Sequence, residues 1–307
     1  MIISASRRTD IPAFYFEWFI NRLKEGYVFI RNPFNRHLIS KIKLSSDVVD
    51  FIVFWTKDPL NMMDKLDHFD RFNIPYYILF TITPYGKDIE PNLSEKTRII
   101  ETFIKLSERI GKTRVLWRYD PIFLTRRIDM EYHAQKFNYL ASRLKGHTDK
   151  CIISFLTLYA KCKRNLKSVN LVDLNKQRKR KIAEAIYEIS KDYNLDIKTC
   201  ATEIDLQDIG IRRGKCIDDN LISKIIGKKI LAKKDKYQRH LCRCVSSIDI
   251  GSYDTCRHNC LYCYANSNPG IVERNYKEHN PSSPLLFGKL VKKDKIIERK
   301  MSSSVIR

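Results

Sequence analysis

Glycine is scarce in this chain, with 10 residues in 307. The glycine-rich loops that cradle phosphates in P-loop and dinucleotide-binding proteins are missing, so nucleotide binding by those routes is not expected. Long apolar runs are missing too, since no stretch approaches the roughly 18 consecutive apolar residues of a membrane span. The first ten residues hold no apolar run that would suit a signal peptide. The sequence therefore predicts a soluble, cytoplasmic protein that does not enter a membrane.

Acidic residues are also in short supply. The chain has 35 Asp and Glu against 57 Lys and Arg, which gives a formal charge of +22. Such a field attracts polyanions, and two basic runs, 176–181 and 224–243, contribute to it. We expect nucleic acid or another anionic, phosphate-rich substrate. The alternative is a lysine-rich surface that serves solubility alone.

Cysteine, by contrast, is unevenly distributed. The chain has nine cysteines, an odd number, and seven of them lie between Cys200 and Cys263. Disulfide frameworks are unusual in a reducing compartment. The grouping therefore indicates metal binding. Cys151 and Cys162, near a predicted strand, are expected to be ordinary buried thiols.

Short runs rich in β-branched and aromatic residues are spaced through the first two-thirds of the chain, with amphipathic helical patterns between most of them. The six predicted strands are Ile2–Ser6, Phe51–Thr56, Tyr76–Thr83, Arg114–Trp117, Ile152–Leu158 and Leu195–Thr199. The predicted helices are Phe14–Lys24, Ser94–Ile110, Met130–Leu144 and Lys179–Tyr193. This alternation predicts an α/β fold: a complete or partial (β/α) TIM-type barrel of about six strands over residues 1–235. Residues 236–307 would form a cysteine-rich segment and tail, and an open doubly wound sheet is the alternative architecture.

Polar side chains follow the predicted strands. In a (β/α) barrel these strand ends converge on the face that carries the active site. Arginine suits a carboxylate or phosphate there, because its planar fork binds such groups bidentately, and a carboxylate suits ribose hydroxyls. The catalytic or substrate-binding candidates, in order of preference, are Arg118 and Asp120, then Arg7, Arg8 and Asp10, then Lys57 and Glu203.

The most specific local pattern is Cys256-Arg-His-Asn-Cys260-Leu-Tyr-Cys263. Three thiolates at this spacing can ligate three irons of a [4Fe–4S] cube and leave the fourth iron open to a substrate or cofactor. Tyr262 would shield such a cluster from water. Zinc is the alternative metal, with the fourth ligand drawn from Cys242, Cys244 or His258.

The remaining thiolates of the late group are Cys200, Cys216, Cys242 and Cys244. Four is the number that closes a second [4Fe–4S] cluster or a structural zinc site. The alternative is that these are ordinary cysteines.

With Tyr262 and Tyr264 beside its last cysteine, the motif resembles the signature of the radical S-adenosylmethionine superfamily, including spore photoproduct lyase. The resemblance implies that the open iron binds S-adenosylmethionine, that Tyr262, Tyr85 and Thr83 line the cofactor site, and that a flavodoxin or ferredoxin donates electrons. In that superfamily the cysteine loop follows the first strand, whereas here it lies near residue 260. The superfamily's Gly-Gly-Glu stretch is also missing.

The whole chain, to about residue 266, resembles an uncharacterised bacterial family, domain-of-unknown-function family 1848. The segments that carry this resemblance are Ser6–Pro12, Phe54–Lys57, Thr81–Tyr85, Trp117–Ile122 and Asp249–Asp254. It implies a shared fold and a cluster, without a settled activity.

Two functions follow from these observations. The first is an iron–sulfur enzyme that cleaves S-adenosylmethionine and abstracts hydrogen from an anionic substrate. The positive charge of the chain makes nucleic acid a candidate for that substrate. The second is a nucleic-acid-binding protein with a structural zinc or iron–sulfur site and no turnover, in which basic runs contact phosphates and exposed aromatics stack on bases. The polar strand ends favour the enzyme.

Overall fold

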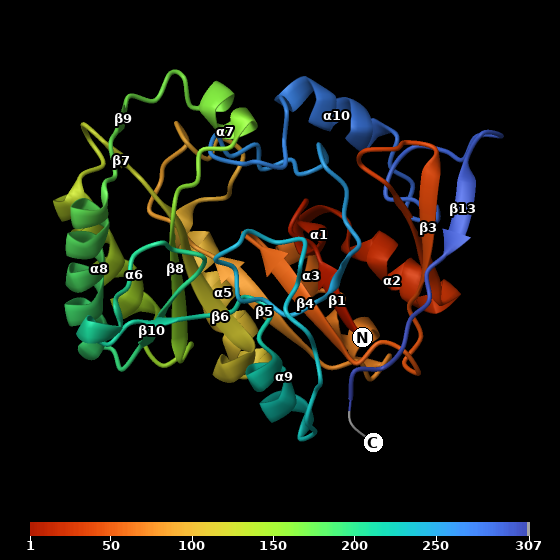
Figure 1. Ribbon diagram of the computed structural model, residues 1–307, viewed down its shortest axis with the longest axis horizontal. Coiled ribbons are helices and arrows are strands. Elements are labelled where there is room, and N and C mark those ends of the chain that lie inside the picture. Colours follow the sequence, from red (N-terminus) through yellow and green to blue (C-terminus); the bar gives the residue numbers. More distant parts are fainter. Residues whose placement is uncertain (306–307) are drawn as a thin grey trace.

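A parallel sheet of eight strands organises the molecule in the computed structural model, which describes residues 1–305 (Figure 1). Every neighbouring pair in this sheet is parallel. The strands, from one edge to the other, are β11 (Arg212–Arg213), β10 (Asp196–Thr199), β8 (Lys150–Phe155), β6 (Val115–Ile122), β5 (Tyr76–Thr81), β4 (Phe51–Thr56), β1 (Ile2–Ala5) and β12 (Ile248–Asp249). From β1 to β11, each later strand of the sheet is added on the same side. The fold is therefore α/β, as the alternation of patterns predicts.

All six predicted strands are present, five of them within a few residues of the predicted ends, whereas β6 continues to Ile122, five residues beyond the predicted end at Trp117. The expected number of strands is wrong, however, because the sheet has eight. The two additional strands, β11 and β12, have two residues each. A segment that short shows no periodicity in the sequence, and its pairing with β10 or β1 depends on the rest of the fold.

The four predicted helices are confirmed as α2, α5, α6 and α8. Side-chain caps fix two of these starts: Asp129 accepts from the amide of Tyr132 at 2.8 Å, and Asn175 accepts from that of Arg178 at 2.9 Å. The helices are α1 (Ile11–Phe14), α2 (Phe16–Glu25), α3 (Leu60–Met63), α4 (Leu66–Asp70), α5 (Lys96–Ile110), α6 (Met130–Leu144), α7 (Ala160–Asn165), α8 (Lys176–Lys191), α9 (Asp219–Ile226) and α10 (Pro269–Lys277), with short 3₁₀ turns at Lys112–Arg114 and Gln207–Ile209.

The two faces of the sheet are both buried, against different partners. One face, here called the crossover face, packs on α2, α5, α6 and α8 through alternate residues such as Phe54 and Trp117. The other, the α9 face, packs on α9 through the intervening residues, for example Val53 and Leu116. Because side chains alternate along a strand, Trp55 and Arg118 lie on the α9 face. Figure 1 shows the segment that carries α9 crossing in front of the strands.

Two smaller sheets complete the fold. Strands β2 (Tyr27–Arg31) and β3 (Leu38–Lys43) form a hairpin, to which β13 (Lys295–Glu298) adds in parallel. Strands β7 (Leu124–Thr125) and β9 (Leu171–Val172) form an antiparallel pair. The segment 236–307 thus contributes β12 to the large sheet and β13 to the hairpin. No helix within residues 1–305 is long and apolar enough to cross a membrane.

Candidate functional site

The carboxyl ends of the parallel strands form one edge of the sheet, and the loop with the three clustered cysteines lies against it. The amide of Leu261 donates to the carbonyl of Ile89, beyond β5, at 3.0 Å. The hydroxyl of Tyr264 donates to the carbonyl of Arg7, beyond β1, at 2.7 Å. The cysteine loop and the polar strand ends, which are far apart in the chain, therefore meet at one edge.

The cysteine loop, residues 254–266, is held in shape by its own polar contacts. The amide of Asp254 donates to the carbonyl of Ala265 at 3.0 Å and closes the loop at its base. The side-chain amide of Asn266 donates to the carbonyl of Cys256 at 2.6 Å and to Asn259 at 3.2 Å. Asn259 has a φ of 52°, a left-handed conformation that Asn tolerates better than most residues. This fold turns the chain sharply between Cys256 and Cys260.

The three thiols of this loop are a suitable donor set for a metal cluster. Burial raises the pKa of Cys260 to about 12 and the pKa of Cys256 well above its ordinary value. Burial also raises the pKa of Cys263, while the ammonium groups of Lys57 and Lys161 oppose this. A bound metal ion reverses the effect of burial, because it deprotonates a coordinating thiol. The amide of Ala265 already lies 3.3 Å from the sulfur of Cys263, a contact of the kind that stabilises cluster thiolates.

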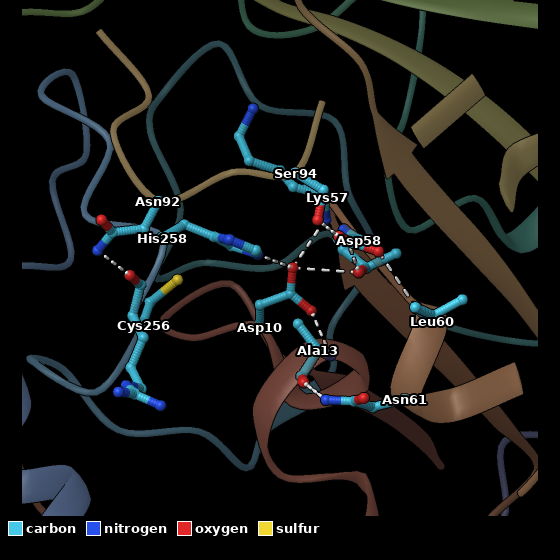
Figure 2. Close-up of polar contacts among 12 residues, drawn as sticks. Asp10, Ala13, Lys57, Asp58, Leu60, Asn61, Asn92, Ser94, Cys256 and His258 are labelled. Carbon is cyan, nitrogen blue, oxygen red and sulfur yellow. Dashed lines mark hydrogen bonds and ion pairs between the residues drawn. The ribbon is translucent and has the colours of Figure 1, made fainter. Parts of the chain in front are cut away.

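Asp10 connects the first strand end to the cysteine loop (Figure 2). Its Oδ2 lies 2.9 Å from Nε2 of His258 and accepts from the amide of Lys57 at 2.7 Å. Its Oδ1 caps α1 through the amide of Ala13 at 2.9 Å. Asp10 and His258 are both buried, and Nδ1 of His258 has no hydrogen-bond partner among the described residues. Asp10 therefore positions the loop, and its oxygens are occupied by protein groups.

Glu90, only 1% exposed, is the second anchor of the loop. Its Oε1 accepts from Lys57 Nζ at 2.7 Å, from Thr83 Oγ1 at 2.6 Å and from the hydroxyl of Tyr262, and its Oε2 pairs with Lys96. Burial alone would raise the pKa of Glu90, but the two lysines lower it to about 2. Burial opposes the charged form of Lys57, and Glu90 nevertheless raises the pKa of that lysine. The charged network fixes the side chain of Tyr262, which lies between Cys260 and Cys263 in the sequence.

An aromatic wall lies beside Tyr262. The ring of Tyr85 stacks on that of Phe123 with centroids 4.4 Å apart and meets Tyr262 edge-on at 5.9 Å. The hydroxyl of Tyr85 donates to the carbonyl of Pro121 at 2.7 Å, and the thiol of Cys162 donates to the carbonyl of Tyr262 at 3.1 Å. The predicted cofactor residues Tyr262, Tyr85 and Thr83 thus lie together, with their hydroxyls bonded to protein groups.

Arg7 and Arg118 both lie over the ring of Trp55, at 5.3 and 4.9 Å from its centroid. Arg118 also pairs with Asp120. Nη2 of Arg7 and Nε of Arg118 are buried and have no hydrogen-bond partner among residues 1–305. Buried polar groups are nearly always paired, so two unpaired guanidinium N–H groups at one place suit an anionic ligand.

The two remaining predicted site residues have other partners. Arg8 pairs with Asp249 at 3.9 Å, lies 5.1 Å from the ring centroid of Tyr253 and reaches the carbonyl of Gly251 at 3.4 Å. Glu203 is exposed and pairs with Lys179 at 2.6 Å. It lines a separate cleft of about 260 Å³ beyond β8 and β10, together with Thr157 and Arg239.

The second group of four cysteines is also brought together. Cys200, Cys216, Cys242 and Cys244 are all buried in the cluster that packs on the α9 face, and the sulfurs of Cys200 and Cys216 are 3.5 Å apart. All nine cysteines are free thiols. As the side chains lie, no group of three or more His, Cys, Asp or Glu within residues 1–305 already encloses a position for a metal ion. Metal binding at either group would therefore involve rotation of the cysteine side chains.

The sequence-based candidates omit three residues that organise the site: Glu90, Lys96 and Asp249. Asp249 accepts from Ser4 Oγ at 3.1 Å and from the amide of Arg7 at 2.7 Å, which joins β12 to the end of β1. One indication of this residue was available in the sequence, because Asp249 belongs to the Asp249–Asp254 segment that carries the family resemblance. Glu90 lies in the polar loop after β5, and Lys96 is the first residue of α5. A charged residue at such a position ordinarily faces solvent, so neither residue was identified as part of a site.

Comparison with known proteins gives a family and no more. No curated protein and no solved structure matches this chain. Residues 2–265 match the model of the family described as Domain of unknown function (DUF1848). This span covers the large sheet, the crossover helices and all nine cysteines. The chain therefore belongs to the DUF1848 family.

Proposed function

We propose that this protein is an iron–sulfur enzyme that holds a [4Fe–4S] cluster through Cys256, Cys260 and Cys263 and uses S-adenosylmethionine to act on an anionic substrate. The docking of the cysteine loop on the carboxyl edge of the parallel sheet carries this proposal. Enzymes built on parallel α/β sheets place their active sites at this edge. We interpret the sheet as an incomplete (β/α) barrel, since its main crossover helices cover one face.

The donor set supports a cluster with an open iron. Three thiols in one loop leave the fourth iron of a cube without a protein ligand. The aromatic wall of Tyr85, Phe123 and Tyr262 screens this side of the loop from water. Cys256, Cys260 and Cys263 would hold the cluster, whose one-electron chemistry would break the S–C5′ bond of S-adenosylmethionine to give methionine and a 5′-deoxyadenosyl radical. A flavodoxin or ferredoxin would provide the electron. Nine free thiols are consistent with a reducing cytoplasm, in which cysteines stay reduced.

Arg7 and Arg118 would bind the anion. Each carries a buried N–H group without a partner in the described part of the chain, which a movement of the side chain would offer to a carboxylate or phosphate oxygen, and both guanidinium groups lie over the ring of Trp55. Asp120 balances one of the charges and orients Arg118. The carboxylate of S-adenosylmethionine and a substrate phosphate share this chemistry. The formal charge of +22 would increase the encounter rate of a polyanionic substrate such as nucleic acid.

Asp10, Lys57 and Glu90 would act as positioning residues. Each is occupied by protein partners: Asp10 holds His258, and Glu90 holds Lys57 and Tyr262. They fix the cysteine loop against the sheet, as the hydrogen-bond partners of ligand-bearing segments do in metal sites.

Anaerobic purification, with iron, sulfide and zinc analysis and EPR of the dithionite-reduced protein, tests the proposal. We expect about four irons per chain at this site, a spectrum that changes when S-adenosylmethionine is added, and loss of both in Cys260→Ala. Cys151→Ala is the matched control, because it removes a buried thiol that lies in β8 and outside the cysteine loop. Iron with an unchanged spectrum would contradict the S-adenosylmethionine step. Iron absent from this loop would overturn the proposal in favour of the nucleic-acid-binding alternative.

A further inference from the structure

The four cysteines outside the first loop come from three segments that the fold pins together on the α9 face. Cys200 directly follows β10, and its amide donates to the carbonyl of Ile153 at 2.9 Å. Cys216 is fixed by Tyr77 of β5, whose hydroxyl donates to its carbonyl at 2.6 Å. Cys244 is fixed to the segment after Cys216, because the amide of Val245 donates to the carbonyl of Ile217 at 3.2 Å.

The four thiols gather in one buried cluster on the α9 face. The sulfurs of Cys200 and Cys216 are 3.5 Å apart. The amide of Ile217 points at the sulfur of Cys244 from 3.4 Å. Exposed fractions of 2–6% show that water does not solvate the four cysteines. Isolated buried cysteines behave as small apolar residues, but four that gather in one cluster are a different arrangement.

The distance of 3.5 Å between the sulfurs of Cys200 and Cys216 suits one metal ion better than a cluster. Four sulfurs at about 2.3 Å from one tetrahedral zinc lie ~3.8 Å from one another, close to the contact between Cys200 and Cys216. In a [4Fe–4S] cube each cysteine binds a different iron, which holds the sulfurs much farther apart. Four thiolates around Zn²⁺ carry a net charge of −2, and cations lie nearby. Nη2 of Arg239, for example, is 3.9 Å from the sulfur of Cys200.

We propose that Cys200, Cys216, Cys242 and Cys244 bind one structural zinc ion, which ties the 200, 216 and 242–244 segments to the α9 face. The site is separate from the proposed iron–sulfur site and does not depend on it, since no cysteine is shared. The zinc site lies on the same face of the sheet as Arg7 and Arg118. The zinc would therefore stabilise the segments that lie next to the proposed anion site. It would compensate for the small amount of regular structure between β10 and α10, where α9 is the only helix of more than one turn.

Metal analysis of the full chain, produced with both zinc and iron in the medium, tests this proposal. We expect about one zinc per chain, lost from Cys216→Ala and Cys244→Ala and retained in Cys260→Ala and Cys151→Ala. Cobalt in place of zinc should give the visible absorption bands of a tetrahedral thiolate site. Because the alanine variants can fail to fold, the wild-type protein should also be titrated with a mercurial thiol reagent, and zinc should be released as four thiols react.

Several results would overturn the site. These are a wild-type protein without zinc, zinc retained in Cys216→Ala, zinc lost from Cys260→Ala alone, iron bound by the four cysteines, or a Cys200–Cys216 disulfide. The two proposals fail separately. Zinc without iron would contradict only the iron–sulfur function, and iron lost only from Cys260→Ala, with no zinc, would contradict only the zinc site.

Discussion

Oδ2 of Asp10 lies 2.9 Å from Nε2 of His258, although 248 positions of the chain separate the two residues. This contact links the end of the first strand to the loop that carries the three cysteines. His258→Ala should loosen the loop, since the loss of a group that orients metal ligands typically reduces metal affinity ~10- to 100-fold. Faster removal of iron by a chelator and faster amide exchange over residues 254–266 are the expected results.

His68→Ala, on an exposed position of α4, is the control for that substitution. It should leave both measurements unchanged. Amide exchange in His258→Ala that equals the wild-type rate would show that the contact with Asp10 does not hold the loop, whatever metal is bound there.

Glu90→Gln should destabilise the protein. The substitution leaves the partly buried ammonium groups of Lys57 and Lys96 without their carboxylate, and removal of one partner from a buried ion pair costs about 3–5 kcal/mol. Urea unfolding of the apoprotein would measure this. Glu95→Gln, with an exposed carboxylate that pairs loosely with Lys87, should change the free energy of unfolding by less than about 0.5 kcal/mol. Equal effects of the two substitutions would refute the role of Glu90.

His133 should make stability depend on pH between about 4 and 6.5. Its ring is fully buried, with Nδ1 2.8 Å from the hydroxyl of Tyr119 and Nε2 2.9 Å from the carbonyl of Phe123. Burial lowers its pKa to about 4, below the value of about 6.5 in the unfolded chain. Folding therefore favours the neutral ring, whose contribution is complete above pH 6.5 and is lost as the pH falls through 4. The loss is on the order of 3 kcal/mol.

Unfolding curves of the wild type and of His133→Gln over this pH range test the assignment. The difference in stability between them should narrow toward pH 4, because the glutamine cannot take up a proton. A difference that stays constant with pH would mean that His133 does not titrate on unfolding.

Gly251→Ala should weaken the junction between β12 and the first strand end. A Cβ atom at this position would lie 2.6 Å from Cβ of Ser6 and 3.0 Å from Cγ2 of Thr9, so the two segments would have to separate. Overpacking of this kind costs roughly 1–3 kcal/mol. Gly270→Ala in the first turn of α10 has only Asn268 nearby, at 3.4 Å. It should be neutral or stabilising by up to about 1 kcal/mol, and a Gly251→Ala protein as stable as this control would contradict the close approach.

Arg118→Lys should reduce affinity for S-adenosylmethionine or for an anionic substrate at the proposed site. Lysine keeps the charge but cannot stack its head group flat on Trp55 or present a two-pronged fork. Loss of one hydrogen bond to a charged ligand costs about 1.5–3 kcal/mol, which corresponds to a weakening of roughly 10- to 100-fold. Equilibrium dialysis under anaerobic conditions would measure it, with exposed Arg126→Lys as the control. Unchanged affinity in Arg118→Lys would remove Arg118 from the site.

The candidate site could be anticipated only in part. Reasoning from strand ends selected Arg7, Asp10, Lys57 and Arg118, which the structure brings to one edge of the sheet. The same reasoning selected Glu203, which lies in a separate cleft, because loops that start from one edge diverge as they leave it. Glu90 was missed because nothing in its neighbours shows that a carboxylate would be buried between two lysines.

Most helices and strands, and the residues that could bind a metal, were identifiable from local sequence patterns. The β-branched runs and the helical periodicity identified six strands and four helices, since backbone conformation and the exposed side of an element depend mostly on nearby residues. The spacing of Cys256, Cys260 and Cys263 placed three thiols in one turn for the same reason.

The partners of these residues became known from the folded chain. The contact of His258 with Asp10, that of Tyr262 with Glu90, and the meeting of Cys200, Cys216, Cys242 and Cys244 join segments from different parts of the chain. The two-residue strands β11 and β12 also acquire their place only by pairing with β10 and β1. Such contacts depend on how the crossovers stack the strands and on which residues share a face of the sheet. Local sequence cannot specify them, because the free energy that selects them is gained only when distant segments are buried together.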